Sequence, residues 1–182
     1  MSKLFASQLL LTSDSDLLFY LKKHQALYNL INNGEHIISY DKLGAIKTNF
    51  FNTGKYAIIL NTLHSVSSPQ ATGHWTILLL EITKQSRNCM YIDSLVSSYK
   101  NHKNLADIID WFCVKYKLKL HLWKTRSQRK NTSNCGFQII FYLSYFFRHE
   151  LKGMYKLQSM LQQYNLPTVE YYILKKAYKL CK

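Results

Sequence analysis

Apolar and polar positions in the first third of this chain change from a helical period to shorter, strand-like runs. Residues 14–31 (DSDLLFYLKKHQALYNLI) are amphipathic at helical spacing, and Ser13 followed by Asp16 is typical of an N-terminal cap, so the pattern predicts one capped helix. Residues 36–40 and 56–61 are β-branched or apolar runs of strand length. We therefore expect a helix followed by two strands.

The middle of the chain carries the pattern of a β-hairpin. Residues 75–82 (WTILLLEI) and 89–93 (CMYID) are apolar runs on either side of the polar segment TKQSRN. Residues 104–116 return to helical spacing, and residues 118–122 alternate leucines with polar side chains. The pattern predicts a hairpin, a crossing helix and a half-buried strand.

One segment in the last third is apolar on nearly every side. Residues 135–148 have the length of a helix, which predicts a central buried helix, and two shorter helical segments split near Pro167 follow it. Together the elements predict an α+β fold, in which a central, mostly antiparallel sheet packs against the buried helix and further helices flank it. A length of 182 residues fits a single domain over residues 1–182.

Composition narrows the class of protein. With 47% hydrophobic and 14% aromatic residues, the chain has ample material for a core, which argues against disorder. No stretch reaches the roughly 18 apolar residues of a membrane span, and the N-terminal sequence MSKLFASQLLLTSDSD lacks the layout of a secretory signal. We expect a soluble, intracellular monomer that does not enter membranes.

The cysteines are spread over the second half of the chain without a CxxC pair: Cys89, Cys113, Cys135 and Cys181. That spacing argues against a zinc ribbon or finger, so we expect no structural metal. Thiols in this setting stay reduced, and buried packing is the simplest role for three of them. Cys135 has neighbours that favour another role.

The charge balance is strongly basic, with 24 Lys and Arg against 10 Asp and Glu and a net charge of +14. Basic residues recur in several segments and are not concentrated in one tail. Such a field favours sequence-independent contact with the phosphates of DNA, with a steep salt dependence. The alternative is a solvated basic surface without a specific partner.

Cys135 lies where the polar loop RKNTSN meets the start of the buried helix. Unpaired backbone amides at a helix N-terminus favour a negative charge and so a reactive thiolate. Asn134 is a candidate helix cap, and Gly136 would let a substrate backbone approach. Taken alone, a cysteine that opens an apolar helix is usually a core residue.

His74 is the candidate base, because it lies at the start of a predicted strand, just after the loop SVSSPQATG. A cysteine nucleophile needs such a base, a group that orients it and a donor for the oxyanion. We expect the other histidines to face solvent, although none is individually ruled out as the base: His24, His36, His64, His102, His121 and His149.

Asp93 is the candidate orienting acid, because it ends the strand paired with the one that His74 begins. If the turn centres near Ser86, Asp93 lies opposite about Leu79 and diagonal to His74, so contact would need strand twist or a bulge. Three other acids compete for this role: Glu81, Asp107 and Asp110.

Gln128 lies in a loop seven residues before Cys135, where its amide could donate to an oxyanion beside the Cys135 backbone amide. Without the cysteine-glycine pair, a solvated loop glutamine would be the simpler interpretation. Trp75, next to the base, could cover the imidazolium face and exclude water, but a strand tryptophan is more often a core residue.

In order and spacing these residues resemble the adenovirus-type maturation protease family, the adenains, within the clan that includes the ubiquitin-like-protein proteases. The resemblance runs over roughly residues 10–150 and rests on Asp41-Lys42, Ala57-Ile58-Ile59-Leu60-Asn61-Thr62, Gly73-His74-Trp75, Cys89-Met90-Tyr91-Ile92-Asp93, Gln128 and Cys135-Gly136. Asp93 departs from the family, whose acid is often glutamate, and matches the ubiquitin-like-protein proteases instead.

The resemblance implies a thiol endopeptidase that processes viral precursor proteins, often after Gly-Gly or Gly-X-Gly sites, in the virion and the host nucleus. It also implies DNA and a short viral peptide as activators, without a metal or organic cofactor. Family members carry a cysteine for that peptide about a dozen residues before the oxyanion glutamine, where this chain has Lys115-Tyr116-Lys117. Cys113 lies nearby but inside a predicted helix, so the peptide's attachment stays unassigned.

Two other classes of function remain open. One is a deubiquitinase or ubiquitin-like-protein isopeptidase of the same clan. The other is a basic nucleic-acid-binding domain that keeps the fold without activity.

Overall fold

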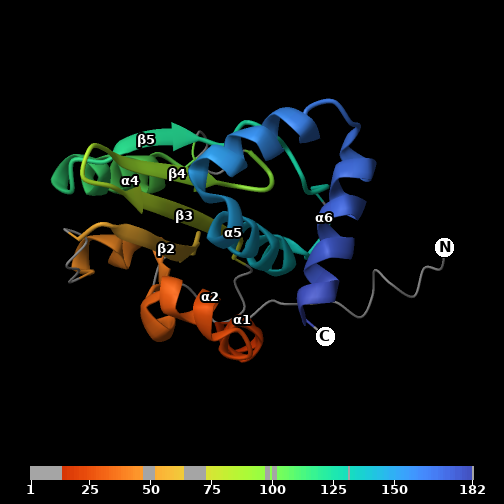
Figure 1. Ribbon diagram of the computed structural model, residues 1–182, viewed down its shortest axis with the longest axis horizontal. Helices are drawn as coiled ribbons and strands as arrows, with labels where there is room; N and C mark the ends of the chain where they lie inside the picture. The colour runs from red at the N-terminus through yellow and green to blue at the C-terminus, as the bar shows by residue number, and fades with distance from the viewer. Residues whose placement is uncertain are drawn as a thin grey trace.

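A five-stranded sheet runs through the computed structural model of this chain, which describes residues 14–46, 52–63, 73–96, 99, 102–130 and 132–181 (Figure 1). In chain order its elements are α1 (Asp14–Lys22), α2 (Gln25–Leu30), η2 (Asn32–Gly34), β1 (Ile37–Ser39), η3 (Tyr40–Ala45), β2 (Gly54–Asn61), β3 (Trp75–Ile82), β4 (Arg87–Ile92), α4 (Lys103–Lys115), β5 (Lys119–Leu122), α5 (Cys135–Leu161) and α6 (Leu166–Cys181). The predicted α+β class is confirmed.

The strands lie in their sequence order, β1-β2-β3-β4-β5. The two central pairs, β2 with β3 and β3 with β4, are antiparallel, whereas β1 pairs with β2 and β5 with β4 in parallel. A parallel pair needs a crossover, and α4 supplies it between β4 and β5. The predicted antiparallel sheet is therefore correct at its centre, and both edges are parallel.

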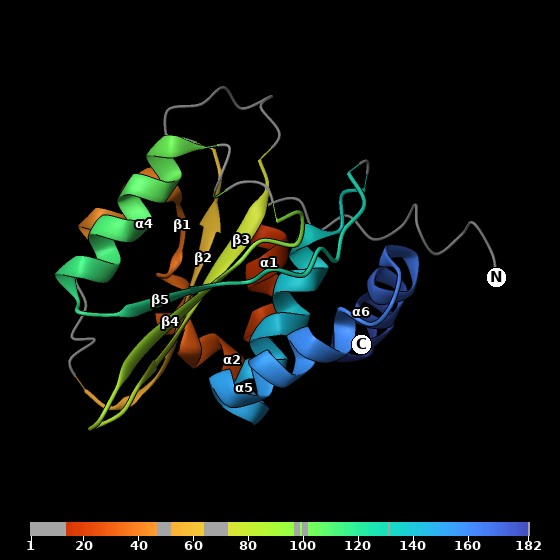
Figure 2. The ribbon, with the colours of Figure 1, turned by 90° about the horizontal axis from the view of Figure 1, so that it is seen from above.

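Side chains of β3 alternate between two cores. Ile77 and Leu79 belong to the apolar cluster that contains the first half of α5, whereas Leu78 and Leu80 belong to the cluster that contains α4. Alternation follows from the two-residue period of a strand, and burial on both faces explains the unbroken apolar run in the sequence. Figure 2 shows α4 on one side of the sheet and α5 with α6 on the other.

The hairpin register differs from the expected one by three residues. Leu79 pairs with Met90, and Ile77 with Ile92 forms the last pair before Asp93. The expectation was wrong because the turn is closed by Thr83 and Ser86, whose backbone N–H and C=O bond at 2.8 Å, so it centres before Ser86. Asp93 consequently lies near the start of β3 without a bulge.

The single N-terminal helix expected over residues 14–31 is two helices, α1 and α2. The backbone N–H groups of Lys23 and His24 end α1 by bonding the carbonyls three residues earlier, those of Tyr20 and Leu21. The His24 ring also bonds the Leu180 carbonyl at 2.6 Å. This contact with the end of α6 favours a corner over a continuous helix. The predicted cap at Ser13 lies outside the described residues.

The central helix α5 begins at Cys135, as expected, and its first part is buried in the core. It breaks at Glu150, which has φ of 58°, and the Glu81 carboxylate accepts the Leu151 N–H at 2.7 Å just after the break. The part of α5 after the break and α6 are the two shorter helices expected, and Pro167 lies in the first turn of α6.

The other predicted elements match β1, β2, β3, β4, α4 and β5 within two residues at each end. The predicted alternation in β5 is only partly correct, because Leu122 is 37% exposed at the edge of the sheet. Among the described helices, none combines the length and apolar character that a membrane crossing requires.

Candidate active site

Three predicted site residues from distant parts of the chain meet at the open end of the β3–β4 hairpin. His74 comes just before β3, Asp93 just after β4, and Cys135 is the first residue of α5. The sheet and the buried helix thereby bring a base, an acid and a thiol together.

The His74 ring is held by Asp93. His74 Nε2 lies 2.7 Å from Asp93 Oδ1, which also accepts the Leu95 N–H at 2.8 Å. The Asp93 side chain is 3% exposed. Because an ionised carboxylate can only accept, Nε2 carries the hydrogen of this bond, which leaves Nδ1 for Cys135.

The backbone of His74 is fixed by the end of β2. Its N–H donates to Thr62 Oγ1 at 3.1 Å, and its carbonyl accepts the Thr62 N–H at 3.0 Å. A side chain at Gly73 would place its Cβ 2.0 Å from Asn61 Oδ1 and 2.9 Å from Leu63 Cγ, so glycine fits here without displacing the Asn61 and Leu63 side chains. The glycine of the Gly-His-Trp motif therefore has a steric reason.

Among the described residues, the Cys135 sulfur has hydrogen-bonding neighbours in His74 and in the backbone N–H groups of Trp75 and Gly136. The residue is 8% exposed. Burial alone raises the pKa of the Cys135 thiol, but the bond to His74, the His74 charge and the two N–H groups outweigh it, so the pKa lies below its ordinary value.

The same pair changes the pKa of His74. Burial lowers it, whereas the hydrogen bonds to Asp93 and Cys135 and the negative charges of both raise it, to about 9. A lowered thiol pKa beside a raised imidazole pKa favours the thiolate–imidazolium ion pair near neutral pH. This pair is the reactive form of a cysteine nucleophile.

Asn134 occupies the N-cap position of α5, but its side chain makes no capping hydrogen bond, so the predicted cap is wrong. The reason is competition: its Nδ2 donates to Glu170 Oε1 at 3.0 Å, and its Oδ1 accepts Gln138 Nε2 at 3.0 Å. Asn134 instead bonds the loop before Cys135 to Glu170 of α6 and to Gln138 of α5.

Gln128 is buried, at 2% exposure, and both ends of its amide are engaged. Ser94 Oγ donates to its Oε1 at 2.6 Å, and its Nε2 donates to the Thr132 carbonyl. The Gln128 backbone N–H also bonds the Ser94 carbonyl at 3.0 Å. Donation to Thr132 uses one of the two hydrogens on Nε2.

Ser94 is a site residue that sequence reasoning missed. It follows Asp93 directly and binds Gln128 through both its side chain and its carbonyl. The end of β4, which carries Asp93, is thus joined through Ser94 to the loop that carries Gln128. The only sequence signal was adjacency to Asp93, which does not indicate a partner thirty-four positions away.

Trp75 is 3% exposed and belongs to the core cluster around α5. Its backbone N–H contacts the Cys135 sulfur, as does that of Gly136. Trp75 and Gly136 therefore contribute main-chain donors, and the Trp75 side chain has the core position that the sequence left open.

Of the competing acids, Glu81 bonds the Leu151 N–H, and Asp110 accepts the Tyr99 hydroxyl at 2.6 Å. Asp107 is exposed on α4. Both observed contacts lie away from His74, so the geometry favours Asp93 as the acid.

The expectation that the remaining histidines face solvent was wrong for His36, which is 4% exposed and contacts the Ala57 carbonyl through Nδ1 at 3.2 Å. Pairing between β1 and β2 brings this ring into the core, and burial lowers its pKa. His24 and His121 are partly buried, and His102 and His149 are exposed. His64 lies outside the described residues.

The other cysteines are free thiols. Cys89 and Cys113 are buried between β4 and α4 and contact each other, as expected for packing. Cys181 is only partly buried, and burial raises its pKa to about 11. Within the described part of the chain, no cluster of three His, Cys, Asp or Glu side chains could hold a metal ion.

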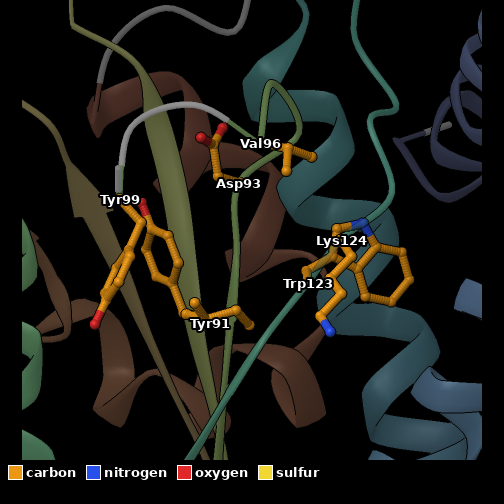
Figure 3. Close-up of a pocket in the computed structure, with 7 residues that line it drawn as sticks. Tyr91, Asp93, Val96, Tyr99, Trp123 and Lys124 are labelled. Carbon is orange, nitrogen blue, oxygen red and sulfur yellow. The ribbon is translucent and has the colours of Figure 1, made fainter. Parts of the chain in front are cut away.

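A cavity of about 300 Å³ borders Asp93 where the ends of β4 and β5 diverge. Figure 3 shows Tyr91 and Tyr99 on one side, Trp123 with Lys124 on the other, and Asp93 at one end. Three of its seven lining residues are aromatic, and Val96 and Leu122 add apolar surface. Asp93, which bonds the His74 ring, is therefore also one of the residues that line this cavity.

No protein-family model and no curated protein matches this chain. Among solved structures it is similar to an AvrA deletion variant with IP6 and CoA, at a TM-score of 0.49 and 12% identity over 78% of this chain and 52% of that chain. It is also similar to a selenomethionine ASFV protease, at a TM-score of 0.45 and 13% identity over 79% of this chain and 66% of that chain. With both TM-scores below 0.5, neither similarity carries a functional conclusion.

Proposed function

We propose that this chain is a cysteine endopeptidase with Cys135 as nucleophile, His74 as base and Asp93 as the acid that orients it. The observation that carries the proposal is the continuous contact from Asp93 Oδ1 through the His74 ring to the Cys135 sulfur. The shifted pKa values of His74 and Cys135 support an ion pair ready for attack on a carbonyl.

In the proposed reaction the Cys135 thiolate attacks the scissile carbonyl carbon, and the carbonyl oxygen takes up the negative charge. His74 Nδ1–H then protonates the leaving amine, which breaks the peptide bond and leaves an acyl-enzyme. Water, deprotonated by His74, releases the acyl group and restores the thiolate. Asp93 stabilises the imidazolium throughout.

Two donors are proposed for the oxyanion. One is the backbone N–H of Cys135, which heads α5 and has no partner within that helix. The other is the second amide hydrogen of Gln128, which Ser94 orients through its hydroxyl. Donors fixed before the reaction need no reorganisation when charge develops, which is what makes them effective.

The substrate class rests on the sequence resemblance to adenain. We propose viral precursor proteins, cleaved at Gly-Gly or Gly-X-Gly type sites in the virion and the host nucleus. DNA and a short viral peptide are the proposed activators. A net charge of +14, with exposed lysines on several elements such as Lys119, Lys152 and Lys175, supports contact with phosphates.

The test is hydrolysis of fluorogenic Gly-Gly peptides by the purified chain and by Cys135→Ala and Cys181→Ala variants. We expect Cys135→Ala to abolish turnover, because it removes the attacking sulfur, and Cys181→Ala to keep it, because that thiol is remote and weakly acidic. Undiminished cleavage by Cys135→Ala would contradict the assignment of Cys135 as the nucleophile.

The same assay separates the substrate classes when it is run with and without duplex DNA and over a range of salt. Peptide cleavage that DNA stimulates and salt suppresses supports the viral protease. Cleavage of ubiquitin-type substrates that ignores DNA supports the isopeptidase, which the aspartate at position 93 favours. DNA binding without thiol reactivity supports the non-catalytic domain.

A further inference from the structure

Helix α6 contributes one buried carboxylate to the loop that leads to the nucleophile. Glu170 is 2% exposed and lies beside Val169, whose side chain packs in the core around α5. An unpaired charge at such a site would be strongly unfavourable. Its partners therefore indicate what the carboxylate does.

All the observed partners of Glu170 come from residues 129–134. Oε1 accepts the Arg129 N–H at 3.1 Å, Thr132 Oγ1 at 3.0 Å and Asn134 Nδ2 at 3.0 Å, and Oε2 accepts Arg129 Nε. Burial raises the pKa of Glu170, but the bonds from Asn134, Arg129 and Thr132 outweigh it and lower the pKa. The carboxylate is therefore ionised near neutral pH.

This segment connects the two residues that need positions fixed in the proposed reaction. Gln128 directly precedes Arg129, and Cys135 directly follows Asn134. Thr132 links the two features, since its carbonyl accepts the Gln128 amide and its hydroxyl proton is shared between Glu170 and the Arg129 carbonyl. Without Glu170, Thr132 would lose one of the contacts that hold it against Gln128.

We propose that Glu170 is a positioning residue, which acts through Thr132 and Asn134 to fix the Gln128 amide where the oxyanion forms. The proposal rests on the proposed function and extends it to a helix beyond residues 10–150, the part that resembles adenain. Glu170 touches neither the sulfur nor the base, so its effect should fall on the oxyanion step and spare the ionisation of Cys135.

The experiment compares Glu170→Gln with Val169→Ala. Glu170→Gln keeps the size of the side chain and loses its charge, whereas Val169→Ala weakens the packing of the same helix turn without touching the loop. We expect Glu170→Gln to lower kcat about tenfold with little change in KM, and Val169→Ala to leave kcat near wild type. Glu170→Asp should restore part of the loss because it restores the charge.

Two readouts separate positioning from general loss of structure. The rate of Cys135 alkylation by iodoacetamide, and its pH dependence, should be unchanged in Glu170→Gln, because alkylation forms no oxyanion. In a Gln128→Ala background, Glu170→Gln should lower kcat little further, because the donor that Glu170 positions is already absent. The proposal would be overturned by a wild-type kcat in Glu170→Gln or by additive effects of the two substitutions on kcat. A fall in the alkylation rate of Glu170→Gln as large as its fall in kcat would also overturn it.

Hydrogen exchange keeps the two proposals apart. If Glu170 holds the loop, Glu170→Gln speeds amide exchange in residues 129–135 alone, and Val169→Ala does not reproduce this. If the wild-type chain cleaves no substrate, the proposed function fails and the catalytic part of this inference fails with it. If the wild-type chain is active and Glu170→Gln leaves amide exchange in the loop unchanged, the Glu170 proposal alone is contradicted.

Discussion

The two ends of the β3–β4 hairpin each present one carboxylate toward α5, and the two carboxylates have different partners. At the open end Asp93 bonds the His74 ring, which contacts the first residue of α5. At the turn end Glu81 bonds the Leu151 N–H where α5 breaks. An imidazole can exchange a proton near neutral pH and a backbone amide cannot. The partner, and not the acid itself, decides which end can support chemistry.

The surroundings of the two ends differ in the same sense. Behind Asp93, Ser127 Oγ donates to Gln138 Oε1 at 2.5 Å and lies 2.6 Å from the Tyr142 hydroxyl, all of them buried. Buried polar groups of this kind are favourable only when each has a partner, and the network holds one arrangement. At the turn end, Thr83 and Ser86 bond each other in solvent. The buried network therefore lies at the end of the hairpin where the proposed reaction takes place.

After Cys135→Ala itself, the largest effect should come from the proposed oxyanion donor at the open end. Gln128→Ala should lower kcat about 10²-fold to 10³-fold, as loss of one such donor does elsewhere. The matched control is Gln158→Ala, which removes another glutamine side chain that bonds a loop, in this case by accepting the Lys124 N–H at 2.9 Å. Steady-state kinetics on a Gly-Gly peptide measures both. Equal losses would show that Gln128 has only a structural role.

The two acids should differ in their effect on turnover. Asp93→Asn weakens a charge-assisted bond worth about 1.5–3 kcal/mol, so we expect kcat to fall about tenfold to a hundredfold, together with a loss of folding stability at pH values below about 9, where His74 is charged. Glu81→Ala leaves the Leu151 N–H without its acceptor, so the free energy of unfolding should fall by about 1–3 kcal/mol while kcat stays near wild type.

Urea unfolding and kinetics on the same two preparations check this contrast. A loss of turnover in Glu81→Ala equal to that in Asp93→Asn would transfer the orienting role to Glu81. A large fall in the free energy of unfolding for Asp93→Asn, with a normal kcat, would show that Asp93 has a structural role and no role in turnover.

The smallest effect is a shift in pH dependence. As pH rises, kcat/KM should increase when Cys135 ionises, below the usual thiol pKa, and decrease when His74 loses its proton near pH 9. The raised His74 pKa contributes stability that is full below pH 6.5 and is lost as pH rises through about 9. Asp93→Asn should move the basic limb to lower pH, and Glu81→Ala should not. A basic limb that stays in place in Asp93→Asn would contradict the contribution of Asp93 to this pKa.

The sequence predicted the parts of the site that depend on order along the chain. Strand ends and helix starts are readable from apolar runs, so His74, Asp93 and Cys135 could be placed at the termini of three elements. The hairpin register could not be placed, because it depends on whether Thr83 or a later residue closes the turn. A turn misplaced by one or two residues moves every partner along the strand.

Tertiary partners were beyond the reach of periodicity. Ser94 and Glu170 have no pattern of their own, and each is defined by a contact with a residue more than thirty positions away. His36 was misplaced because a histidine before a short strand is as compatible with an edge as with a core. Asn134 was assigned to the nearest helix, whereas the carboxylate of a later helix holds its amide.

The place of Glu170 in the chain has a consequence for timing during synthesis. A ribosome releases His74 and Asp93 first, then Cys135, and only afterwards the turn of α6 that completes the hydrogen bonds to the loop before Cys135. An unfinished copy would hold its thiol without a settled oxyanion donor. Under the proposed function, such a copy should cleave its substrate more slowly than one in which α6 has already been synthesised and folded.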